Sequence, residues 1–191
     1  LHSIEEPTIE GNRFIVRRTK NGDTGMLQNH VLLPETGNAQ IEKVGGKGKE
    51  FWVFGTNYPN DALPNRPDDA NERGAWRVEV SPAVPAAENY FLNVMQVADN
   101  TCKRMNDVKR IDAGKVVGVQ IADRIVTFSK NSLPLSGKID MKVDGNTSMK
   151  FVITDLIPGT WQIKKDGKVY IPAMEVRSND GILSFEGTAG H

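Results

Sequence analysis

Residues 116–128 read Val116-Val117-Gly118-Val119-Gln120-Ile121-Ala122-Asp123-Arg124-Ile125-Val126-Thr127-Phe128. Two short runs rich in strand-forming residues lie on either side of Ala122-Asp123. A separation of two residues is the spacing of a tight β-hairpin. This stretch therefore predicts a pair of antiparallel strands, and the same pattern returns along most of the chain.

Further hairpins are predicted toward the C-terminus. Asp166-Gly167 is a favoured hairpin turn, because both central residues of a type I′ turn need a positive φ. The predicted strands on either side of it are 161–164 and 168–171. The other predicted pairs are 138–143 with 149–154, joined by Asp144-Gly145-Asn146, and 176–177 with 182–185, joined by Ser178-Asn179-Asp180-Gly181.

The N-terminal half of the chain alternates in the same way. Residues 76–80 place Trp76, Val78 and Val80 on one face of a strand and two charged residues on the other. Residues 50–54 contain a continuous apolar run, which predicts a central strand that is buried on both faces. The remaining predicted strands are 13–19, 24–33, 41–44 and 90–97.

The fold class follows from this patterning, because helical periodicity is almost absent. About a dozen short strands at intervals of roughly 8 to 12 residues predict an all-β protein, a two-layer antiparallel β-sandwich with little or no helix. We expect one sandwich domain over residues 1–191. The expected core comprises Phe14, Val16, Phe54, Trp76, Val78, Phe91, Val119, Phe128 and Phe151.

The charge balance argues against several classes of partner. The chain has 24 Lys+Arg and 24 Asp+Glu, a formal net charge of +0, so we expect neither nucleic-acid nor membrane binding. No apolar run reaches the roughly 18 residues of a membrane span. Paired basic residues such as Arg17-Arg18 point to opposite faces of a strand, and we interpret most of them as solvated. Contact with an acidic saccharide is the alternative interpretation.

No residue pattern predicts a metal site or a cofactor. His2, His30 and His191 lie outside the short spacings that zinc motifs require. His30 shares a strand face with Gln28, which indicates an exposed side chain. The stretch that begins at Gly45-Gly46 lacks the Ser/Thr and the helix of a phosphate-binding loop, so we interpret it as a turn.

The segment 55–74 departs from the strand pattern, because it is polar and rich in Pro, Asn and Asp. A loop of about 20 residues inside a compact domain is uncommon and is often functional. We interpret it either as a mobile surface loop or as a loop that contacts a ligand or a neighbouring domain. Tyr58 and Arg66 lie in this segment and are candidate substrate-binding residues, together with Trp161 at the start of a predicted strand.

A series of short segments along most of the chain follows the order found in a known protein family. It comprises Leu1-His2-Ser3, Leu32-Leu33-Pro34, Val44-Gly45-Gly46, 51–55, 74–82, 90–95, 156–161 and 181–185. This order resembles the C-terminal β-sandwich region of the heparinase II/III-like polysaccharide lyases. The shared motifs are strands and turns, so the resemblance supports a prediction of the fold more strongly than a prediction of the activity.

The resemblance implies a bacterial protein that is periplasmic or secreted, and whose full-length form cleaves a uronic-acid polysaccharide by β-elimination. In such lyases an N-terminal helical toroid supplies most of the catalytic groups, and the sandwich supports the substrate cleft. The sequence contains no helical toroid, so we expect the isolated 191 residues to be inactive. A catalytic histidine on the sandwich is known in the family, and His2 is the nearest candidate by position.

Two other functions remain open from the sequence. The chain could be a stand-alone carbohydrate-binding module, which grips sugar rings with exposed aromatic side chains, or a structural or adhesion sandwich. Trp52 and Trp76 lie in apolar runs and are expected in the core. Trp161 is the tryptophan expected to stack on a sugar. The resemblance implies as partners the helical toroid of the same polypeptide and an acidic polysaccharide, and no cofactor is expected.

Overall fold

The computed structural model describes residues 1–58 and 74–190. Within these residues the chain forms sixteen β-strands and no helix, which confirms the all-β prediction. The strands fall into two compact units, Leu1–Met105 (unit 1) and Asn106–His191 (unit 2). Each unit has its own hydrophobic core. The boundary of one domain over residues 1–191 stays a prediction.

The strands are short and follow one another closely along the chain. Unit 1 contains β1 (His2–Ser3), β2 (Thr8–Glu10), β3 (Arg13–Lys20), β4 (Asp23–Leu33), β5 (Ala39–Gly45), β6 (Trp52–Val53), β7 (Thr56–Asn57), β8 (Trp76–Pro82) and β9 (Leu92–Ala98). Unit 2 contains β10 (Val108–Ala113), β11 (Val116–Ile121), β12 (Arg124–Ser129), β13 (Val143–Ile153), β14 (Gly159–Lys165), β15 (Lys168–Val176) and β16 (Leu183–Gly190).

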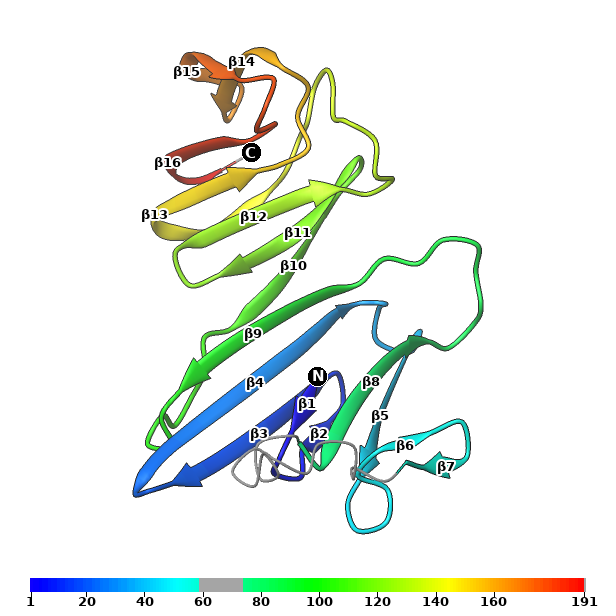
Figure 1. Ribbon diagram of the computed structural model, residues 1–191. Coiled ribbons are helices and arrows are strands. Elements are labelled where there is room, and N and C mark those ends of the chain that lie inside the picture. The colour runs from blue at the N-terminus through cyan, green and yellow to red at the C-terminus, as the bar shows by residue number, and fades with distance from the viewer. Residues whose placement is uncertain (59–73, 191) are drawn as a thin grey trace. The chain divides into compact units, whose positions relative to one another are not determined.

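Unit 1 is built from two antiparallel sheets that share a core. One sheet has the strand order β2-β3-β4-β9 and the other has the order β1-β8-β5 (Figure 1). Phe14 and Val31 of the first sheet form a buried cluster with Val78 of the second. Because residues of both sheets meet in one cluster, the two sheets are the layers of a sandwich.

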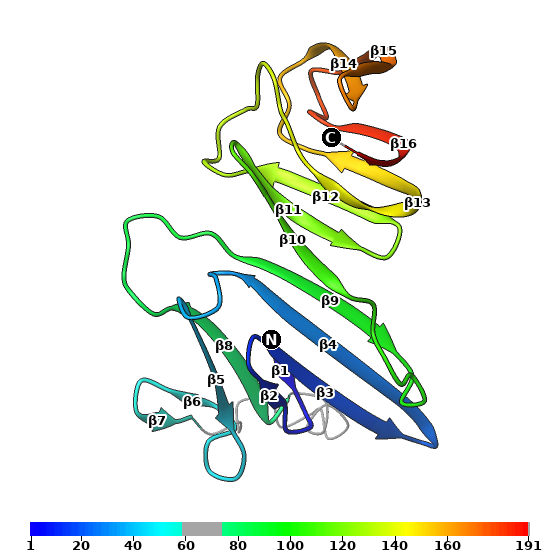
Figure 2. The ribbon, with the colours of Figure 1, turned by 180° about the vertical axis from the view of Figure 1, so that it is seen from behind.

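Unit 2 also has two layers, but they are unequal. A five-stranded sheet has the order β10-β11-β12-β13-β16, and β14 and β15 form a separate hairpin (Figure 2). Val116 and Leu183 of the large sheet belong to the same buried cluster as Val176 of the hairpin. The hairpin therefore covers part of one face of the large sheet. Within that sheet β12 pairs with β13 in the parallel direction, whereas the other strand pairs are antiparallel.

Two of the predicted hairpins form as predicted, whereas the pair 176–177 with 182–185 does not, because β15 pairs with β14 and β16 pairs with β13. β11 and β12 pair across Ala122-Asp123, with Ile121 opposite Arg124. The Asp166-Gly167 turn joins β14 to β15, and its residues have φ values of 50° and 77°. These positive values are those of a type I′ hairpin turn, which Asp-Gly favours. The local turn signal is therefore confirmed at these two positions.

The predicted turn at Asp144-Gly145-Asn146 is wrong. These residues lie inside β13, which pairs with β16 on one side and with β12 on the other. The register of β13 against β16 shifts between Val143 and Ser148, so this part of the strand is irregular. Val143 and Ser148, on either side of these residues, pair with Gly190 and Thr188 of β16, so the strand does not fold back on 138–142. The local turn signal could not reveal this.

The predicted central strand at 50–54 is also wrong. Trp52–Val53 and Thr56–Asn57 form a two-stranded hairpin outside both main sheets. Phe54 occupies its turn with a φ of 48°, and its side chain is 100% exposed. An apolar run predicts a buried strand only if the backbone continues through it, and the turn at Phe54-Gly55 reverses the chain.

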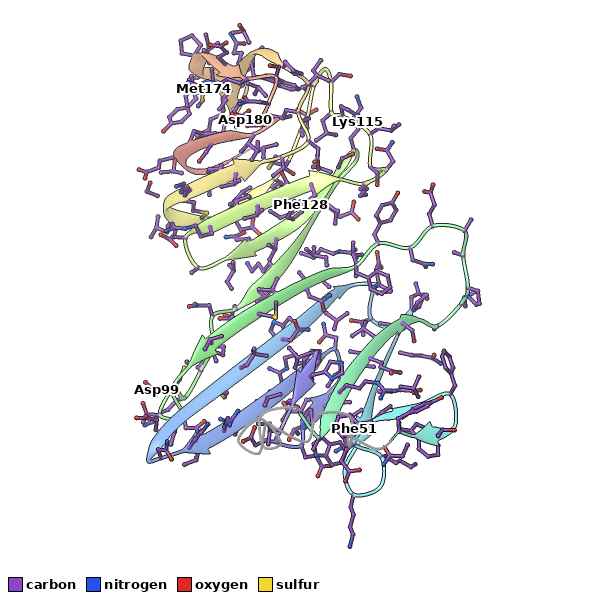
Figure 3. All side chains as sticks on the ribbon, in the orientation of Figure 1. Phe51, Asp99, Lys115, Phe128, Met174 and Asp180 are labelled. Atoms are coloured by element: carbon purple, nitrogen blue, oxygen red, sulfur yellow. The ribbon has the colours of Figure 1, made fainter. Side chains whose placement is uncertain are left out.

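The predicted core is confirmed in part. Phe14, Val78, Val119 and Phe151 are buried, and two further members of the set, Val16 and Trp76, are half-buried. Three members are wrong, because Phe54, Phe91 and Phe128 are exposed. Phe128, labelled in Figure 3, alternates with the buried Thr127 and so points to the opposite face of β12.

The same substitution at two phenylalanines tests this core. Phe14→Ala should lower the free energy of unfolding by about 3 to 5 kcal/mol, because Phe14 is 4% exposed and its loss leaves a cavity. Phe54→Ala should change it by less than about 0.5 kcal/mol, because that ring is in solvent. Urea unfolding of both variants measures the difference. Similar losses in the two variants would contradict the structure.

Candidate functional site

His2, the candidate catalytic residue, lies on the short edge strand β1. It is paired with Arg77 of β8, and its side chain is exposed. The N-terminal ammonium group of Leu1 donates a hydrogen bond to the Val78 carbonyl oxygen at 3.1 Å, which holds this edge strand in place. The structure therefore presents the imidazole of His2 to solvent from an ordered strand.

Arg77 is the charged neighbour of His2 on that face. Residues directly opposite each other in an antiparallel pair share a face, and alternation places Arg77 opposite to the buried Val78. The guanidinium group forms an ion pair with Glu79 and donates a hydrogen bond to the Trp52 carbonyl oxygen. The surface beside His2 thus combines an imidazole with a cation and an anion that are bound to each other.

The candidate binding residues lie in different parts of the chain. Tyr58 directly follows β7 in unit 1 and is 54% exposed. Trp52, whose carbonyl accepts the Arg77 hydrogen bond, is paired with Asn57, so the segment bearing Tyr58 is linked to the strand beside His2. Arg66 and most of the 55–74 segment lie outside the described residues.

Trp161, the candidate stacking residue, belongs to β14 of unit 2. Its ring is half-buried and packs against the apolar cluster beneath the β14–β15 hairpin. The indole Nε1 donates a hydrogen bond to the Ile157 carbonyl oxygen at 3.1 Å. Stacking of Trp161 on a sugar stays a prediction, whereas its packing role is a direct observation.

A group of polar side chains on β3, β4 and β9 was missed by the sequence analysis. We call Arg13, Gln28, His30 and Gln96 the polar patch. Arg13 pairs with His30, and Gln28 pairs with Gln96, so all four share one face of the sheet. Gln28 and Gln96 are only 8% and 9% exposed. This face is opposite to the one that carries Phe14.

His30 is half-buried, so the expectation of an exposed side chain is wrong. Its Nε2 lies 3.4 Å from the Nε2 of Gln28. Burial, followed by the positive charge of Arg13, lowers the pKa of His30 below its ordinary value. Near neutral pH the imidazole is therefore uncharged, with one nitrogen that donates and one that accepts a hydrogen bond.

The sequence indicated only the part of this patch that lies on β4. Alternation in β4 placed Gln28 and His30 on one face, but the partner strand β9 is distant in sequence. Without the pairing of Gln28 with Gln96, an isolated polar face looks solvated. Amide and imidazole groups in this arrangement can form hydrogen bonds with a polar ligand or with a covering protein segment.

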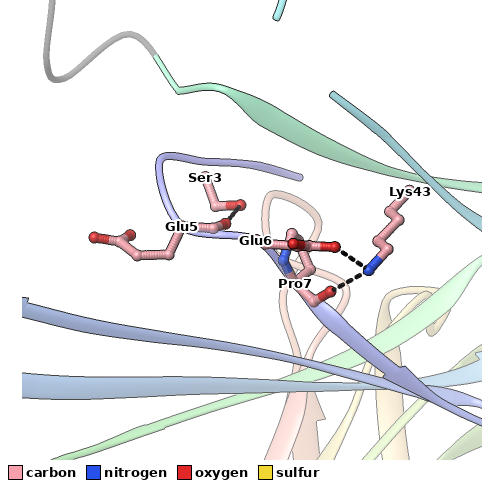
Figure 4. A network of polar contacts seen from close by, with 5 residues as sticks. All are labelled: Ser3, Glu5, Glu6, Pro7 and Lys43. Atoms are coloured by element: carbon pink, nitrogen blue, oxygen red, sulfur yellow. Dashed lines mark hydrogen bonds and ion pairs between the residues drawn. The ribbon is translucent and has the colours of Figure 1, made fainter. Parts of the chain in front are cut away.

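β5 ends at Gly45, and the turn that follows it begins at Gly46. Both glycines pack closely against the segment Ala75-Trp76. A Cβ at Gly45 would lie 2.2 Å from the Ala75 carbonyl oxygen, and one at Gly46 would lie 2.8 Å from the Trp76 ring. Lys43 covers the same ring, with its Nζ 5.6 Å from the centroid. Figure 4 shows its ammonium group at the Glu6 carboxylate and the Pro7 carbonyl.

Gly45 at the end of β5 and Gly48 in the turn after it both have a positive φ, so the same substitution at each gives a matched stability test. Gly45→Ala should lower the free energy of unfolding by more than about 3 kcal/mol, because the new Cβ adds a clash with backbone atoms to an unfavourable φ of 149°. Gly48→Ala should cost about 1 to 2 kcal/mol, since its φ is also positive but no atom lies near its Cβ. Equal losses in thermal or urea unfolding would exclude the close approach.

The polar patch predicts a pH dependence of stability. Because the pKa of His30 is lowered on folding, the unfolded chain binds its proton more readily. The contribution is complete above pH 6.5, the ordinary pKa, and is lost as the pH falls through the lowered value. His30→Gln should remove this part of the stability loss between about pH 7.5 and 5 in urea unfolding.

His2→Gln serves as the control for the pH experiment, because His2 is exposed on an edge strand. This variant should lose stability on acidification as the parent protein does. The assignment to His30 is wrong if the two variants have the same pH profile.

Residues 1–58 and 74–190 contain neither a metal-binding cluster nor a membrane-spanning helix. In that part of the chain, no group of three or more His, Cys, Asp or Glu side chains could hold a metal ion. The same residues include no helix that is long and apolar enough to cross a membrane. Among the described residues, the candidate functional groups are His2, Tyr58, Trp161 and the polar patch.

Comparison with known proteins bears on unit 2. Residues 110–191 match a family model that is described as the heparinase II C-terminal domain. A search of the curated proteins gave no match to the chain. The matched region begins within β10 and continues through the strands β11 to β16. The resemblance to the C-terminal region of heparinase II/III-like polysaccharide lyases is therefore confirmed for residues 110–191.

Proposed function

We propose that this chain is the C-terminal β-sandwich region of a bacterial heparinase II/III-like polysaccharide lyase. The observation that carries the proposal is the match of residues 110–191 to the heparinase II C-terminal domain. In the full-length protein the region supports a catalytic helical toroid and forms one wall of its substrate cleft. The substrate is an acidic polysaccharide, which the whole enzyme cleaves by β-elimination.

β-Elimination at a uronic acid requires several functional groups, and we propose that the sandwich supplies only some of them. The reaction needs a base for the C5 proton, an acid for the leaving oxygen and a group that neutralises the carboxylate. All three must be within hydrogen-bond reach of one sugar ring. His2 and Tyr58 are the candidate contributions of unit 1. We assign the remaining catalytic groups to the toroid.

His2 is the sandwich residue proposed to take part in catalysis. Its exposure on β1 leaves the imidazole accessible to a substrate bound against this edge. Arg77 beside it could attract an acidic sugar only in competition with Glu79. Tyr58 is proposed to contact the polysaccharide near this edge. Arg66, which lies outside the described residues, and Trp161 of unit 2 are proposed as further contacts.

Export to the periplasm or the cell exterior belongs to the same proposal, because a polysaccharide taken from outside the cell is too large to cross the inner membrane uncleaved. Fractionation of bacteria that express the full-length protein tests this location. Recovery in the periplasm or medium supports the proposal, and confinement to the cytoplasm contradicts it.

The hairpin β6–β7 favours a second candidate function, that of a carbohydrate-binding module. Phe54 in its turn is 100% exposed, and Tyr58 just after it is 54% exposed. Exposed aromatic rings are the usual surfaces on which such modules stack sugars, because the faces of sugar rings are apolar. Tight saccharide binding by the 191 residues, lost in Phe54→Ala and Tyr58→Ala, would favour this alternative.

An activity assay decides on the lyase proposal. The purified 191-residue chain, incubated with heparin, heparan sulfate, hyaluronan, chondroitin or alginate, should release no unsaturated product, because it lacks the toroid. The full-length protein should release unsaturated ends from one of these substrates. Appearance of such ends with the 191 residues alone would contradict the proposal, since a complete site would then lie within the sheets.

The role of His2 is tested in the full-length protein. His2→Ala should lower kcat by roughly 10² to 10⁴-fold if the imidazole transfers a proton. Lys168→Ala, an exposed change on β15 in unit 2, is the control and should retain the parent rate. An unchanged rate and pH profile in His2→Ala would show that the sandwich supplies no proton-transfer group at this position.

A further inference from the structure

Unit 2 contains a cavity that includes none of the proposed catalytic residues, although Trp161, proposed above as a saccharide contact, is part of its lining. It lies between the large sheet and the β14–β15 hairpin, and residues of the 137–143 segment contribute to its wall. Its volume is about 460 Å³, which is within the usual range for small-molecule sites. All of its lining residues belong to unit 2, so the cavity is formed by this unit alone.

Aromatic rings form one side of the cavity. Phe151 of β13 and Phe185 of β16 are stacked, with ring centroids 4.8 Å apart and planes inclined by 1°. Gly187 lies beside them, and a Cβ there would be 3.5 Å from both Phe151 and Tyr170. A glycine at this place leaves open the space between three rings, which a side chain would fill.

The polar atoms of the aromatic wall are already bound to the protein. The Tyr170 hydroxyl donates a hydrogen bond to the Glu186 carbonyl oxygen at 3.1 Å. Trp161 Nε1 donates to the Ile157 carbonyl oxygen at the same distance. The hydroxyls of a sugar buried against this wall would lose hydrogen bonds to water without regaining them from these donors. The wall therefore suits an apolar body.

The charged groups of the lining are mainly cationic. Lys138, Lys164 and Lys165 line the cavity, and Asp140 is the one acidic residue among the described lining residues. Asp140 forms an ion pair with Lys138 at 2.9 Å, so Lys164 and Lys165 leave an excess of positive charge. The Lys138 side chain is 80% exposed, which places part of the lining at the surface. An anionic group there would be attracted by these lysines.

We propose that unit 2 binds a small amphipathic anion in this cavity. The apolar body of the ligand, an acyl chain or an aromatic ring, lies against Phe151, Phe185 and Gly187. Its single acidic group lies toward Lys164 and Lys165. This site contains neither His2 nor Tyr58 and requires no group from the proposed toroid.

Calorimetric titration of the whole 191-residue chain tests the ligand class, with decanoate as the probe. We expect saturable binding with one site per chain. Decan-1-ol has the same chain length without the charge and should bind at least fivefold more weakly. Glucuronate carries the acidic group without an apolar body and should not bind measurably. Binding of glucuronate in preference to decanoate, or equal binding of decanoate and decanol, would overturn the proposal.

Variants then locate the site. Gly187→Leu places a side chain between the rings and should weaken decanoate binding at least tenfold. Ile163→Phe fills the cavity from the hairpin side and should act in the same direction, which guards against a folding defect in one variant. Circular dichroism and thermal unfolding establish that each variant is folded. Undiminished binding in both folded variants would exclude this cavity.

A charge variant tests the position of the acidic group. Lys164→Gln together with Lys165→Gln should weaken decanoate binding several-fold and leave decanol binding unchanged. Lys150→Gln removes an exposed positive charge from β13 outside the cavity lining and serves as the control. Equal effects of the control and the double variant on decanoate would show that net charge, and not this site, governs the binding.

Discussion

Each main sheet of this protein has an apolar face, and the need to cover that face with a second layer governs the rest of the structure. In unit 1, Phe14 and Val31 meet Val78 from the opposite sheet. In unit 2, Val116 of the large sheet meets Val176 of the β14–β15 hairpin. Once these faces are covered, alternation fixes which side chains point outward, and the exposed position of His2 on β1 follows from the pairing of that edge.

The sequence predicted the elements whose signals are local. The Asp166-Gly167 turn and the pairing across Ala122-Asp123 depend on a few neighbouring residues, and both form as expected. The errors arise where distant segments decide. β13 continues through Asp144 because Val143 and Ser148, on either side of it, pair with β16. Phe54 is exposed because the chain turns there. No window of a few residues contains that information.

The candidate site shows the same division. Alternation within β8 gave the correct outward face for Arg77. The segments 156–161 and 181–185, on which the family resemblance partly rested, lie within the residues that match the heparinase II C-terminal domain. The polar patch escaped notice because β4 and β9 are brought together only by the sheet. Gln28 looked solvated until Gln96 was placed beside it. Periodicity in a single sequence predicts which side chains share a face of one strand. It does not predict which distant strand lies beside that face.

The parallel pairing of β12 with β13 has a consequence for the order in which unit 2 assembles. β10, β11 and β12 are joined by tight turns, so their contacts close short loops. A parallel partner must instead be reached by a connection that returns along the sheet, here residues 130–142. Closing that longer loop lowers the chain entropy before the hydrogen bonds between β12 and β13 can compensate for the loss. We expect the meander of β10 to β12 to be the early template, and the docking of β13 to be the slower event that completes the sheet.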